Sequence, residues 1–339
     1  MRKPLLLFLG DTTDPSDAKT AFGLRDWCPD DVVGQYHLSP RLPGAVDLGL
    51  TPMDPGRAAA AGARALLIGI APVGGRLAPA WVTPLVAALE AGLDLISGLH
   101  QRLEDIDAIR DAAARHGRTL HNVRHSDRVF DAGTGVKRSG CRLLTVGTDC
   151  ALGKKYTALA IARELRARGV DADFRATGQT GIMIAGGGVA IDAVVSDFIA
   201  GAAEWLSPAN RPEHWDVIEG QGSLHSPAYA GVAEGLLHGS PHDALVLCHD
   251  PSRTHMVDLP HVPMPGVAEA LELALTLAHR TNPAARAVGV SVNTSRLTDA
   301  DREAVTADLR RQTGLPVFDP LKDGVDDVCD RLVGEKVGG

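Results

Sequence analysis

Near the middle of the chain stands Thr145-Val-Gly-Thr-Asp-Cys-Ala-Leu-Gly-Lys-Lys-Tyr-Thr157, which joins a short apolar segment to a segment with helical periodicity. Residues 142–146 predict a buried strand, and residues 154–168 predict a helix that Gly169 ends. Between them, two glycines allow backbone N–H groups to converge on an anion at the positive end of a helix dipole, where Lys154 adds a full charge. This pattern is typical of a phosphate-binding loop and predicts a di- or triphosphate ligand.

The loop departs from the standard P-loop pattern in two ways. Five residues, rather than four, separate its first glycine from the pair Gly153-Lys154. This longer form resembles the dethiobiotin-synthetase-like branch of P-loop proteins, which opens with a similar Gly-Thr-Asp. Lys155 stands where Ser or Thr normally binds Mg²⁺, and Tyr156 precedes the first ordinary hydroxyl at Thr157. The sequence therefore argues against magnesium-dependent nucleotide hydrolysis, and a tight turn without ligand is the alternative.

The composition narrows the class of protein. The 339 residues suffice for two domains, and 45% of them are hydrophobic while only 4% are aromatic, which suits alternating α/β layers built from aliphatic side chains. The net charge of −8 argues against nucleic acid or an anionic membrane as partner. The apolar run at the N-terminus is too short for a signal peptide, and the five cysteines form no C-x-x-C pair. We expect a cytoplasmic homo-oligomer that binds no metal.

Residues 1–137 show repeated strand–helix units and predict a Rossmann-like domain with a parallel sheet. Strands are expected near residues 5–9, 65–70, 93–96 and 119–122, and helices after Asp54-Pro55 and near 84–91 and 103–115. Residues 10–20 are expected to form a polar turn. No G-x-G-x-x-G motif opens a helix here, so the domain lacks a dinucleotide fingerprint.

Ligands of such sheets bind beyond the carboxyl ends of the strands. The substrate-binding candidates are the polar and glycine residues expected there, together with two residues of the glycine-dense segment 175–189, which we expect to be a loop close to a ligand. They are Lys19, Gly74, Gly75, His100, Gln179 and Thr180. Solvated loop positions without a ligand are the alternative.

Residues 124–140 are polar and aperiodic, which places the domain boundary between residues 137 and 138. The second domain, residues 138–339, is expected to be a P-loop NTPase-like α/β domain that binds the phosphates of a nucleotide or, as the family resemblance described below implies, of coenzyme A (CoA). Further strands are expected at residues 215–218, 244–248 and 287–292, with a Pro-rich loop at 259–265. The cofactor-binding candidates are the phosphate loop and one residue after the last of these strands, namely Gly147, Thr148, Asp149, Cys150, Ala151, Leu152, Gly153, Lys154, Lys155, Tyr156, Thr157 and Asn293.

Four residues are candidates for a catalytic base. Glu219 comes first, because it ends the 215–218 strand, where a Walker-B-type carboxylate would stand beside the phosphate loop. Asp192 and Asp197, expected on a helix at residues 191–201, and His225 in the loop after Glu219 follow. Solvated positions are the alternative for these three. Cys150 is expected to be a small residue suited to a tight turn and not a nucleophile.

Several motifs, taken together, resemble one family. They are Gly147-Thr-Asp-Cys-Ala-Leu-Gly-Lys154, Ala176-Thr-Gly-Gln-Thr-Gly-Ile182, Glu219-Gly-Gln-Gly-Ser223, Pro227-Ala-Tyr-Ala230 and Leu237-His-Gly-Ser240, with Lys19-Thr-Ala21, Gly69-Ile-Ala-Pro-Val-Gly-Gly75 and Ser97-Gly-Leu-His100 before them. With these motifs the chain is similar, over nearly its whole length, to a two-domain P-loop family formerly of unknown function, whose characterised members are D-glutamate N-acetyltransferases. Tyr156 departs from the Thr that the family tends to carry.

The resemblance implies transfer of an acetyl group from acetyl-CoA to the amine of D-glutamate or a similar acidic amino acid. The residues themselves are compatible with this reaction, because CoA carries a pyrophosphate that a P-loop binds without hydrolysing it. Two other functions stay open at this point: an ATP-dependent ligase or kinase of the dethiobiotin-synthetase type, and a regulatory protein that senses CoA or a nucleotide.

Overall fold

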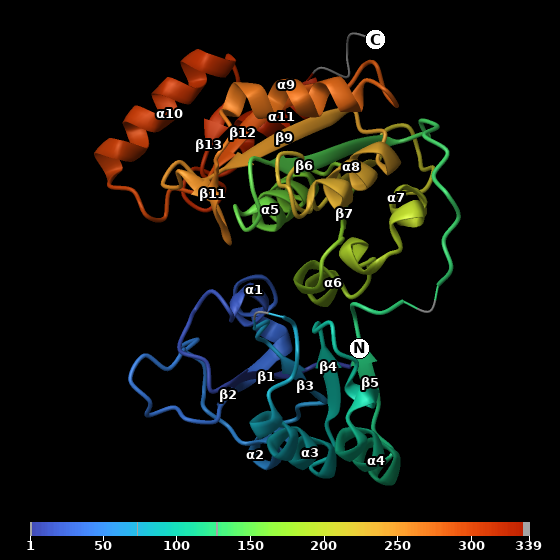
Figure 1. The fold of residues 1–339 in the computed structure, drawn as a ribbon, viewed down its shortest axis with the longest axis vertical. Helices are drawn as coiled ribbons and strands as arrows, with labels where there is room; N and C mark the ends of the chain where they lie inside the picture. Colours follow the sequence, from blue (N-terminus) through green and yellow to red (C-terminus); the bar gives the residue numbers. More distant parts are fainter. Residues whose placement is uncertain (1, 73, 127, 335–339) are drawn as a thin grey trace. The chain divides into compact units, whose positions relative to one another are not determined.

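The computed structural model describes residues 2–72, 74–126 and 128–334. The chain forms two compact units: unit 1 is Met1–Asp127 with Gln179–Ala190, and unit 2 is Arg128–Gly178 with Ile191–Gly339. Each unit has a parallel β-sheet with helices packed against it, which confirms the predicted α/β fold class (Figure 1). The functional roles that the sequence suggests for residues 1–137 and 138–339 stay predictions.

Unit 1 holds a parallel sheet in the order β2-β1-β3-β4-β5. Its strands are β1 (Leu5–Gly10), β2 (Val32–His37), β3 (Ala65–Ile68), β4 (Asp94–Ser97) and β5 (Leu120–Asn122). Its helices are α1 (Lys19–Trp27), α2 (Pro55–Ala60), α3 (Val82–Glu90), α4 (Asp107–His116) and α6 (Gln179–Ala185), with short 3₁₀ turns η1 (Pro29–Asp31), η2 (Pro79–Trp81) and η3 (Leu103–Asp105). All of β1 is buried, as expected of a strand covered on both faces.

Three details of the N-terminal part of unit 1, before residue 127, differ from the sequence prediction. Strand β2 was not predicted, since its alternation is interrupted by Gly34 and Gln35. The polar turn expected at residues 10–20 ends early, because α1 begins at Lys19 and buries Leu24 in the core. The helix expected at 103–115 is divided between η3 and α4, because Ile106 has extended backbone angles.

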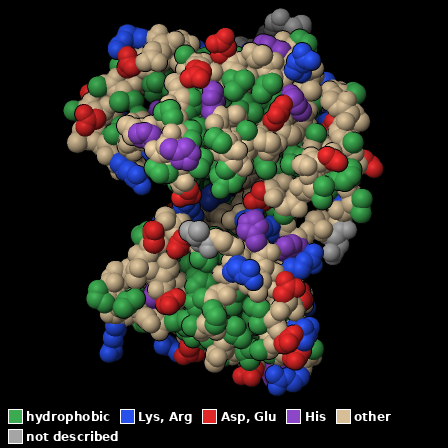
Figure 2. Space-filling view, in the orientation of Figure 1, with side chains coloured by type: hydrophobic (Ala, Val, Ile, Leu, Met, Phe, Trp, Pro, Cys, Tyr) green, Lys and Arg blue, Asp and Glu red, His purple; other side chains and the backbone are tan. Residues whose placement is uncertain are grey.

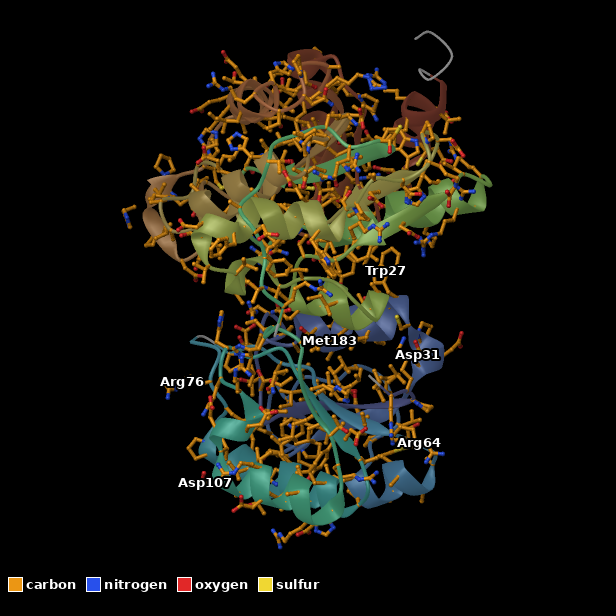
Figure 3. The ribbon with its side chains drawn as sticks, turned by 90° about the vertical axis from the view of Figure 1, so that its right-hand side faces the viewer. Trp27, Asp31, Arg64, Arg76, Asp107 and Met183 are labelled. Atoms are coloured by element: carbon orange, nitrogen blue, oxygen red, sulfur yellow. The ribbon has the colours of Figure 1, made fainter. Side chains whose placement is uncertain are left out.

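Helix α6 lies in the segment that we expected to be a loop, and that expectation was wrong. Its side chains Thr180, Ile182 and Met183 are buried, and Met183 joins the hydrophobic core of unit 1 (Figure 3). The three glycines at residues 186–188 follow the helix and do not interrupt it. The chain therefore leaves unit 2 after Gly178 and contributes one helix to unit 1.

Unit 2 holds a parallel six-stranded sheet in the order β13-β12-β9-β6-β8-β7. Its strands are β6 (Cys141–Gly147), β7 (Ala172–Arg175), β8 (Trp215–Ile218), β9 (Ala244–His249), β12 (Arg286–Val292) and β13 (Val317–Phe318). Its α-helices are α5 (Lys154–Ala167), α7 (Ile199–Leu206), α8 (Ala230–Gly239), α9 (Val267–Ala278), α10 (Asp299–Thr313) and α11 (Asp326–Gly334).

An antiparallel pair of short strands, β10 (His255–Met256) and β11 (Leu259–Pro263), projects after β9. The Pro-rich loop expected at residues 259–265 is therefore partly a strand, which is possible because proline is tolerated on the edge of a two-stranded ribbon. Acidic and basic side chains are interspersed on the visible face of each unit (Figure 2). Within the described part of the chain, no helix has the length and apolar character needed to cross a membrane.

Candidate functional site

The phosphate loop connects β6 to α5, as the sequence predicts. Its backbone turns sharply at Gly153, where φ is +106°, and at Ala151, where φ is +54°. Within the described residues, the backbone N–H groups of residues 150–153 donate no hydrogen bond to protein. Four successive N–H groups at the start of a helix are therefore available to an anion.

Lys154 supplies the positive charge of the loop. Its side chain is buried, and its Nζ donates to the carbonyl oxygen of Asp149 at 2.7 Å. A Cβ atom on Gly147 would lie 3.1 Å from this Nζ, so the ammonium lies over the first glycine of the loop. Burial lowers the pKa of Lys154, and an anionic ligand would oppose that effect by favouring the charged form.

The first ordinary hydroxyl after the two loop lysines, that of Thr157, is occupied by protein contacts. Thr157 is fully buried, its Oγ1 donates to the carbonyl of Gly153 at 3.1 Å, and it lies 2.8 Å from the Ser291 hydroxyl of β12. Lys155, which replaces the usual Ser or Thr, has its Nζ 4.6 Å from the centroid of the Tyr156 ring. The start of α5 therefore presents ammonium groups where a magnesium-binding P-loop presents a hydroxyl.

Glu219 lies directly after β8, the strand that pairs with β6. Its carboxylate is buried, and Oε2 accepts hydrogen bonds from the N–H groups of Thr177 at 3.0 Å and Gly178 at 3.1 Å. Burial raises the pKa of Glu219, although the charge of Lys155 and both N–H groups act in the opposite direction. Among the described groups none donates to Oε1, so half of the carboxylate is available to a ligand.

The segment after Glu219 crosses the end of β6 at very close range. A Cβ atom on Gly220 would lie 1.6 Å from the carbonyl oxygen of Thr145, so only glycine fits there. The N–H of Gly220 donates to the Thr145 hydroxyl at 2.9 Å, and the Ser223 hydroxyl donates to the carbonyl of Thr148 at 3.0 Å. These bonds hold Glu219 beside the phosphate loop.

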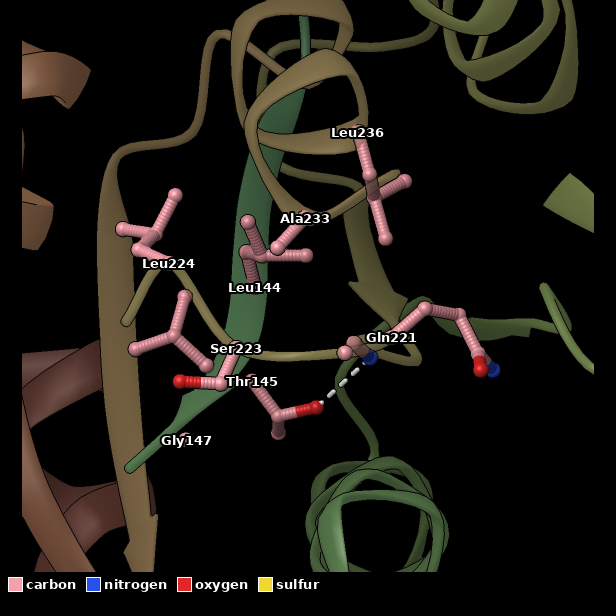
Figure 4. Close-up of a pocket in the computed structure, with 11 residues that line it drawn as sticks. Leu144, Thr145, Gly147, Gln221, Ser223, Leu224, Ala233 and Leu236 are labelled. Carbon is pink, nitrogen blue, oxygen red and sulfur yellow. Dashed lines mark hydrogen bonds between the residues drawn. The ribbon is translucent and has the colours of Figure 1, made fainter. Parts of the chain in front are cut away.

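A small cavity of about 20 Å³ lies between this segment, β6 and α8 (Figure 4). It is lined mainly by Leu144, Leu224, Ala233 and Leu236, with Ser223 at its polar side. A space of this size holds about one water molecule. It is too small to contain a substrate.

Two other candidate bases are not on the helix that the sequence predicted. Asp192 lies in a 3₁₀ turn, η4 (Ile191–Ala193), and Asp197 in a second one, η5 (Ser196–Phe198). The helix prediction fails because Val195 has ψ of 134° and interrupts the segment before α7. Both carboxylates are exposed.

His225, the third of these, has its Nδ1 3.9 Å from the Glu269 carboxylate of α9. Within the described structure no hydrogen bond joins Asp192, Asp197 or His225 to Glu219. Of the four candidates, Glu219 is the one that directly follows a strand paired with the phosphate-loop strand β6.

Asn293 follows β12 and reaches the loop through one intermediate. Its backbone N–H donates to the carbonyl of His249 at 2.9 Å, and His249 Nδ1 shares a hydrogen bond of 3.0 Å with the Thr148 hydroxyl. The Asn293 side chain accepts a bond from the Ser295 N–H at 3.1 Å and closes its own turn. Cofactor binding by Asn293 stays a prediction.

Arg253, in the segment between β9 and β10, was not a sequence candidate. Its Nη1 donates to Asp149 Oδ2 at 3.1 Å and to the carbonyl of Cys150 at 2.9 Å, and its Nη2 donates to the carbonyl of Ala151 at 3.0 Å. The available signal was an arginine just after the strand that pairs with the phosphate-loop strand. Burial raises the pKa of the Cys150 thiol, which disfavours its reactive thiolate form.

The substrate candidates Gln179 and Thr180 belong to unit 1, as do the other four. The Thr180 hydroxyl lies 2.7 Å from that of Thr20 at the start of α1, and Gln179 packs against Gly98 after β4. Elsewhere in unit 1, Gly75 and His100 are in contact, and the backbone N–H of His100 donates to the Gly75 carbonyl at 3.0 Å. Lys19 and Gly74 are exposed.

A group of potential metal ligands lies in unit 2, in and just before β7 and β8. Ligand atoms of Asp173, His214 and Asp216 lie within 4.8 Å of one another. The Asp216 carboxylate already accepts hydrogen bonds from Arg175 and Ser207, both at 2.6 Å. This carboxylate is neutralised by protein groups, and we assign no metal there.

These features define a two-domain protein with a Rossmann-like unit and a P-loop unit. A family model described as the P-loop domain of DUF1611 matches residues 129–329, and one described as the Rossmann-like domain of the same family matches residues 44–126. The chain belongs to the DUF1611 family. A crystal structure of a DUF1611 family protein from Anabaena variabilis superposes with a TM-score of 0.87 at 31% identity, and the match covers 98% of this chain and 100% of that one.

Two relatives carry a functional name. A D-glutamate N-acetyltransferase of Tritonibacter scottomollicae is 49% identical over 330 residues, which is 97% of this chain and 98% of the relative. A D-glutamate N-acetyltransferase of a Pseudoalteromonas species is 44% identical over 332 residues, 98% of this chain and 99% of the relative. The family resemblance seen in the sequence motifs is confirmed.

Proposed function

We propose that this protein is an N-acetyltransferase that transfers the acetyl group of acetyl-CoA to the amine of D-glutamate. Two full-length relatives with that name support the reaction. The structural observation that supports the cofactor is the phosphate loop, which offers four N–H groups and Lys154 to an anion but no hydroxyl to a metal. A loop of this kind suits a pyrophosphate that is bound and not cleaved.

The phosphate loop would bind the pyrophosphate of CoA. The N–H groups of residues 150–153 and the Lys154 ammonium would contact its phosphates, and Lys155 adds a second charge at the start of α5. The reaction then needs no metal, because these groups neutralise the phosphates.

Glu219 would act as the general base. The amine nitrogen attacks the thioester carbonyl, the C–N bond forms, and the C–S bond breaks to release CoA thiolate. The proton that leaves the amine goes to the free Oε1 of Glu219. Its raised pKa brings the carboxylate closer to the operating pH, which favours proton transfer. Asp192, Asp197 and His225 are the alternative bases.

Unit 1 would bind the carboxylates of D-glutamate. The start of α1 carries the Lys19 ammonium and the Thr20 hydroxyl, which is paired with that of Thr180. His100, which contacts Gly75, is a further candidate. Cations and hydroxyls are suited to hold a dicarboxylate. From its negative charge we further propose that the protein has no nucleic-acid or membrane partner, and from its free cysteines that it is cytoplasmic. A homo-oligomer also stays a proposal.

The test compares the two enzymatic functions directly. Titration calorimetry measures the affinity for acetyl-CoA and, separately, the affinity for ATP with Mg²⁺. A thiol assay then follows the release of CoA from acetyl-CoA in the presence of D-glutamate, with L-glutamate as the control substrate. We expect binding of acetyl-CoA and turnover that depends on D-glutamate. Turnover that requires ATP and Mg²⁺ would instead favour the ligase or kinase of the dethiobiotin-synthetase type.

A further inference from the structure

We propose that Arg253 is a positioning residue that holds the phosphate loop in its anion-binding shape before the ligand arrives. The inference rests on the proposed function only for the identity of the ligand as CoA. The contacts of Arg253 support anion binding by the loop whatever molecule carries the phosphates.

All three nitrogens of the Arg253 guanidinium group contact the phosphate loop or the neighbouring Asp250. It contacts the Asp149 carboxylate and the carbonyl oxygens of Cys150 and Ala151, at distances from 2.9 to 3.1 Å. Its Nε also lies 3.3 Å from Asp250 Oδ2, which fixes the guanidinium plane. The side chain is only 16% exposed, so it is packed and not free in solvent.

These bonds determine which way the loop N–H groups point. In a trans peptide the C=O and the following N–H point in opposite directions. Arg253 bonds two successive carbonyls, those of Cys150 and Ala151, while the Lys154 ammonium bonds the carbonyl of Asp149. The N–H groups of Ala151 and Leu152 follow the two carbonyls bonded by Arg253, so they point away from the guanidinium and remain available to an anion.

Arg253 also compensates a buried negative charge within an anion-binding loop. The Asp149 side chain is 2% exposed, and its Oδ2 accepts from Arg253 and from the N–H of Val257 at 2.7 Å. Without Arg253 this carboxylate would repel a phosphate bound to the same loop. The arginine therefore contributes shape and charge, and a lysine could supply only the charge because it lacks the planar fork.

The experiment uses the full chain and two probes. Inorganic pyrophosphate binding is measured by calorimetry, and kcat/KM is measured with acetyl-CoA and with acetyl-pantetheine, which has the thioester but no pyrophosphate. For Arg253→Gln we expect the affinity for pyrophosphate and kcat/KM with acetyl-CoA to fall about 10- to 100-fold. In the same variant, kcat/KM with acetyl-pantetheine should stay within about twofold of the wild-type value. Arg253→Lys should recover part of the affinity. Arg311→Gln, at an exposed ion pair on α10, is the control and should change neither.

A second variant separates charge from shape. In the double variant Arg253→Gln with Asp149→Asn, the uncompensated carboxylate is gone, so part of the lost pyrophosphate affinity should return. Equal losses with acetyl-CoA and acetyl-pantetheine, or unchanged pyrophosphate binding in Arg253→Gln, would overturn the positioning role. If the wild-type protein binds pyrophosphate but not acetyl-CoA, the proposed function fails and the role of Arg253 is still tested by pyrophosphate.

Discussion

The hydroxyl of Thr20 lies 2.7 Å from the hydroxyl of Thr180, and both side chains are buried. This bond joins the first turns of α1 and α6 in unit 1, although 160 residues separate its partners along the chain. One hydroxyl donates to the other, in a place where burial would otherwise leave both without a hydrogen bond.

Replacement of one partner should therefore cost more than replacement of both. Thr180→Val keeps the side-chain shape but leaves the Thr20 hydroxyl buried and unpaired, which should lower the free energy of unfolding by about 1–3 kcal/mol. The double variant Thr20→Val with Thr180→Val should recover much of that loss. Urea denaturation measures both effects. If the double variant is as destabilised as the sum of the single ones, the hydroxyl pair is not a coupled unit.

Lys154→Ala should weaken the binding of CoA. A charge-assisted contact of this kind contributes roughly 1.5–3 kcal/mol, which corresponds to about 10- to 150-fold in affinity. Calorimetry with CoA measures the change, and Lys137→Ala is the control, because Lys137 pairs with Asp243 before β9 and not with the loop. An unchanged CoA dissociation constant would remove the basis for assigning the pyrophosphate to this loop.

Magnesium should be dispensable for acetyl transfer. Position 155 is a lysine, and the Thr157 hydroxyl is engaged with Gly153 and Ser291 inside the unit. Turnover in EDTA should match turnover in added Mg²⁺ when CoA release is followed. A strict requirement for the metal would show that another group recruits it.

Glu219→Gln should remove acetyl transfer but leave the binding of acetyl-CoA and of the amino-acid substrate intact. The amide oxygen can still accept the N–H bonds of Thr177 and Gly178, but the side chain no longer takes a proton, so kcat should fall by about 10²- to 10⁴-fold. The rate at saturating substrate decides this. A near-normal rate in this variant, together with loss of activity in Asp192→Asn or Asp197→Asn, would move the base away from β8.

The same variant should be more stable than the wild type at neutral pH. Because burial raises the pKa of Glu219, the folded protein holds this proton more tightly than the unfolded chain does. The wild type therefore loses stability as the pH rises from the unfolded pKa, 4.5, through the higher folded value, and the glutamine avoids that loss. Thermal melts at neutral and acidic pH should show the advantage of Glu219→Gln shrinking as the pH falls towards 4.5.

His242 should make the protein sensitive to mild acid. The side chain is fully buried, and burial lowers its pKa from 6.5 to about 4. The folded protein keeps His242 neutral, so its contribution to the free energy of unfolding is complete above the unfolded pKa of 6.5. This contribution is lost as the pH falls from 6.5 to about 4, and the loss amounts to about 3 kcal/mol. Urea denaturation across this range measures it. His242→Gln should lose this pH dependence of the free energy of unfolding, whereas the control variant His261→Gln, at an exposed histidine, should keep it. If both variants show the same pH dependence, His242 is not its source.

The sequence predicted the parts of the fold that depend on local pattern. The phosphate loop, β6 and α5 are set by glycine spacing, by a buried apolar run and by helical periodicity, all of which are read within a short window. The position of Glu219 also followed, because it needed only a strand end next to β6.

The parts that depend on distant contacts could not be predicted in this way. Helix α6 is stabilised by the core of unit 1, and its glycines gave the local appearance of a loop. Arg253 acts through carbonyls of a loop about 100 residues earlier in the chain, so no local motif marks it. The helix expected to carry Asp192 and Asp197 failed at Val195, where β-branched side chains favour extended backbone.

The chain enters unit 1 a second time at Gln179, and this has a consequence for how the gene can be divided. A cut near residue 127 yields one product that lacks α6 and a second that carries α6 without the core to which Met183 belongs. Neither half is then an independent module for recombination or for expression by itself. A division that follows the two units must therefore keep residues 179–190 together with the N-terminal part of unit 1.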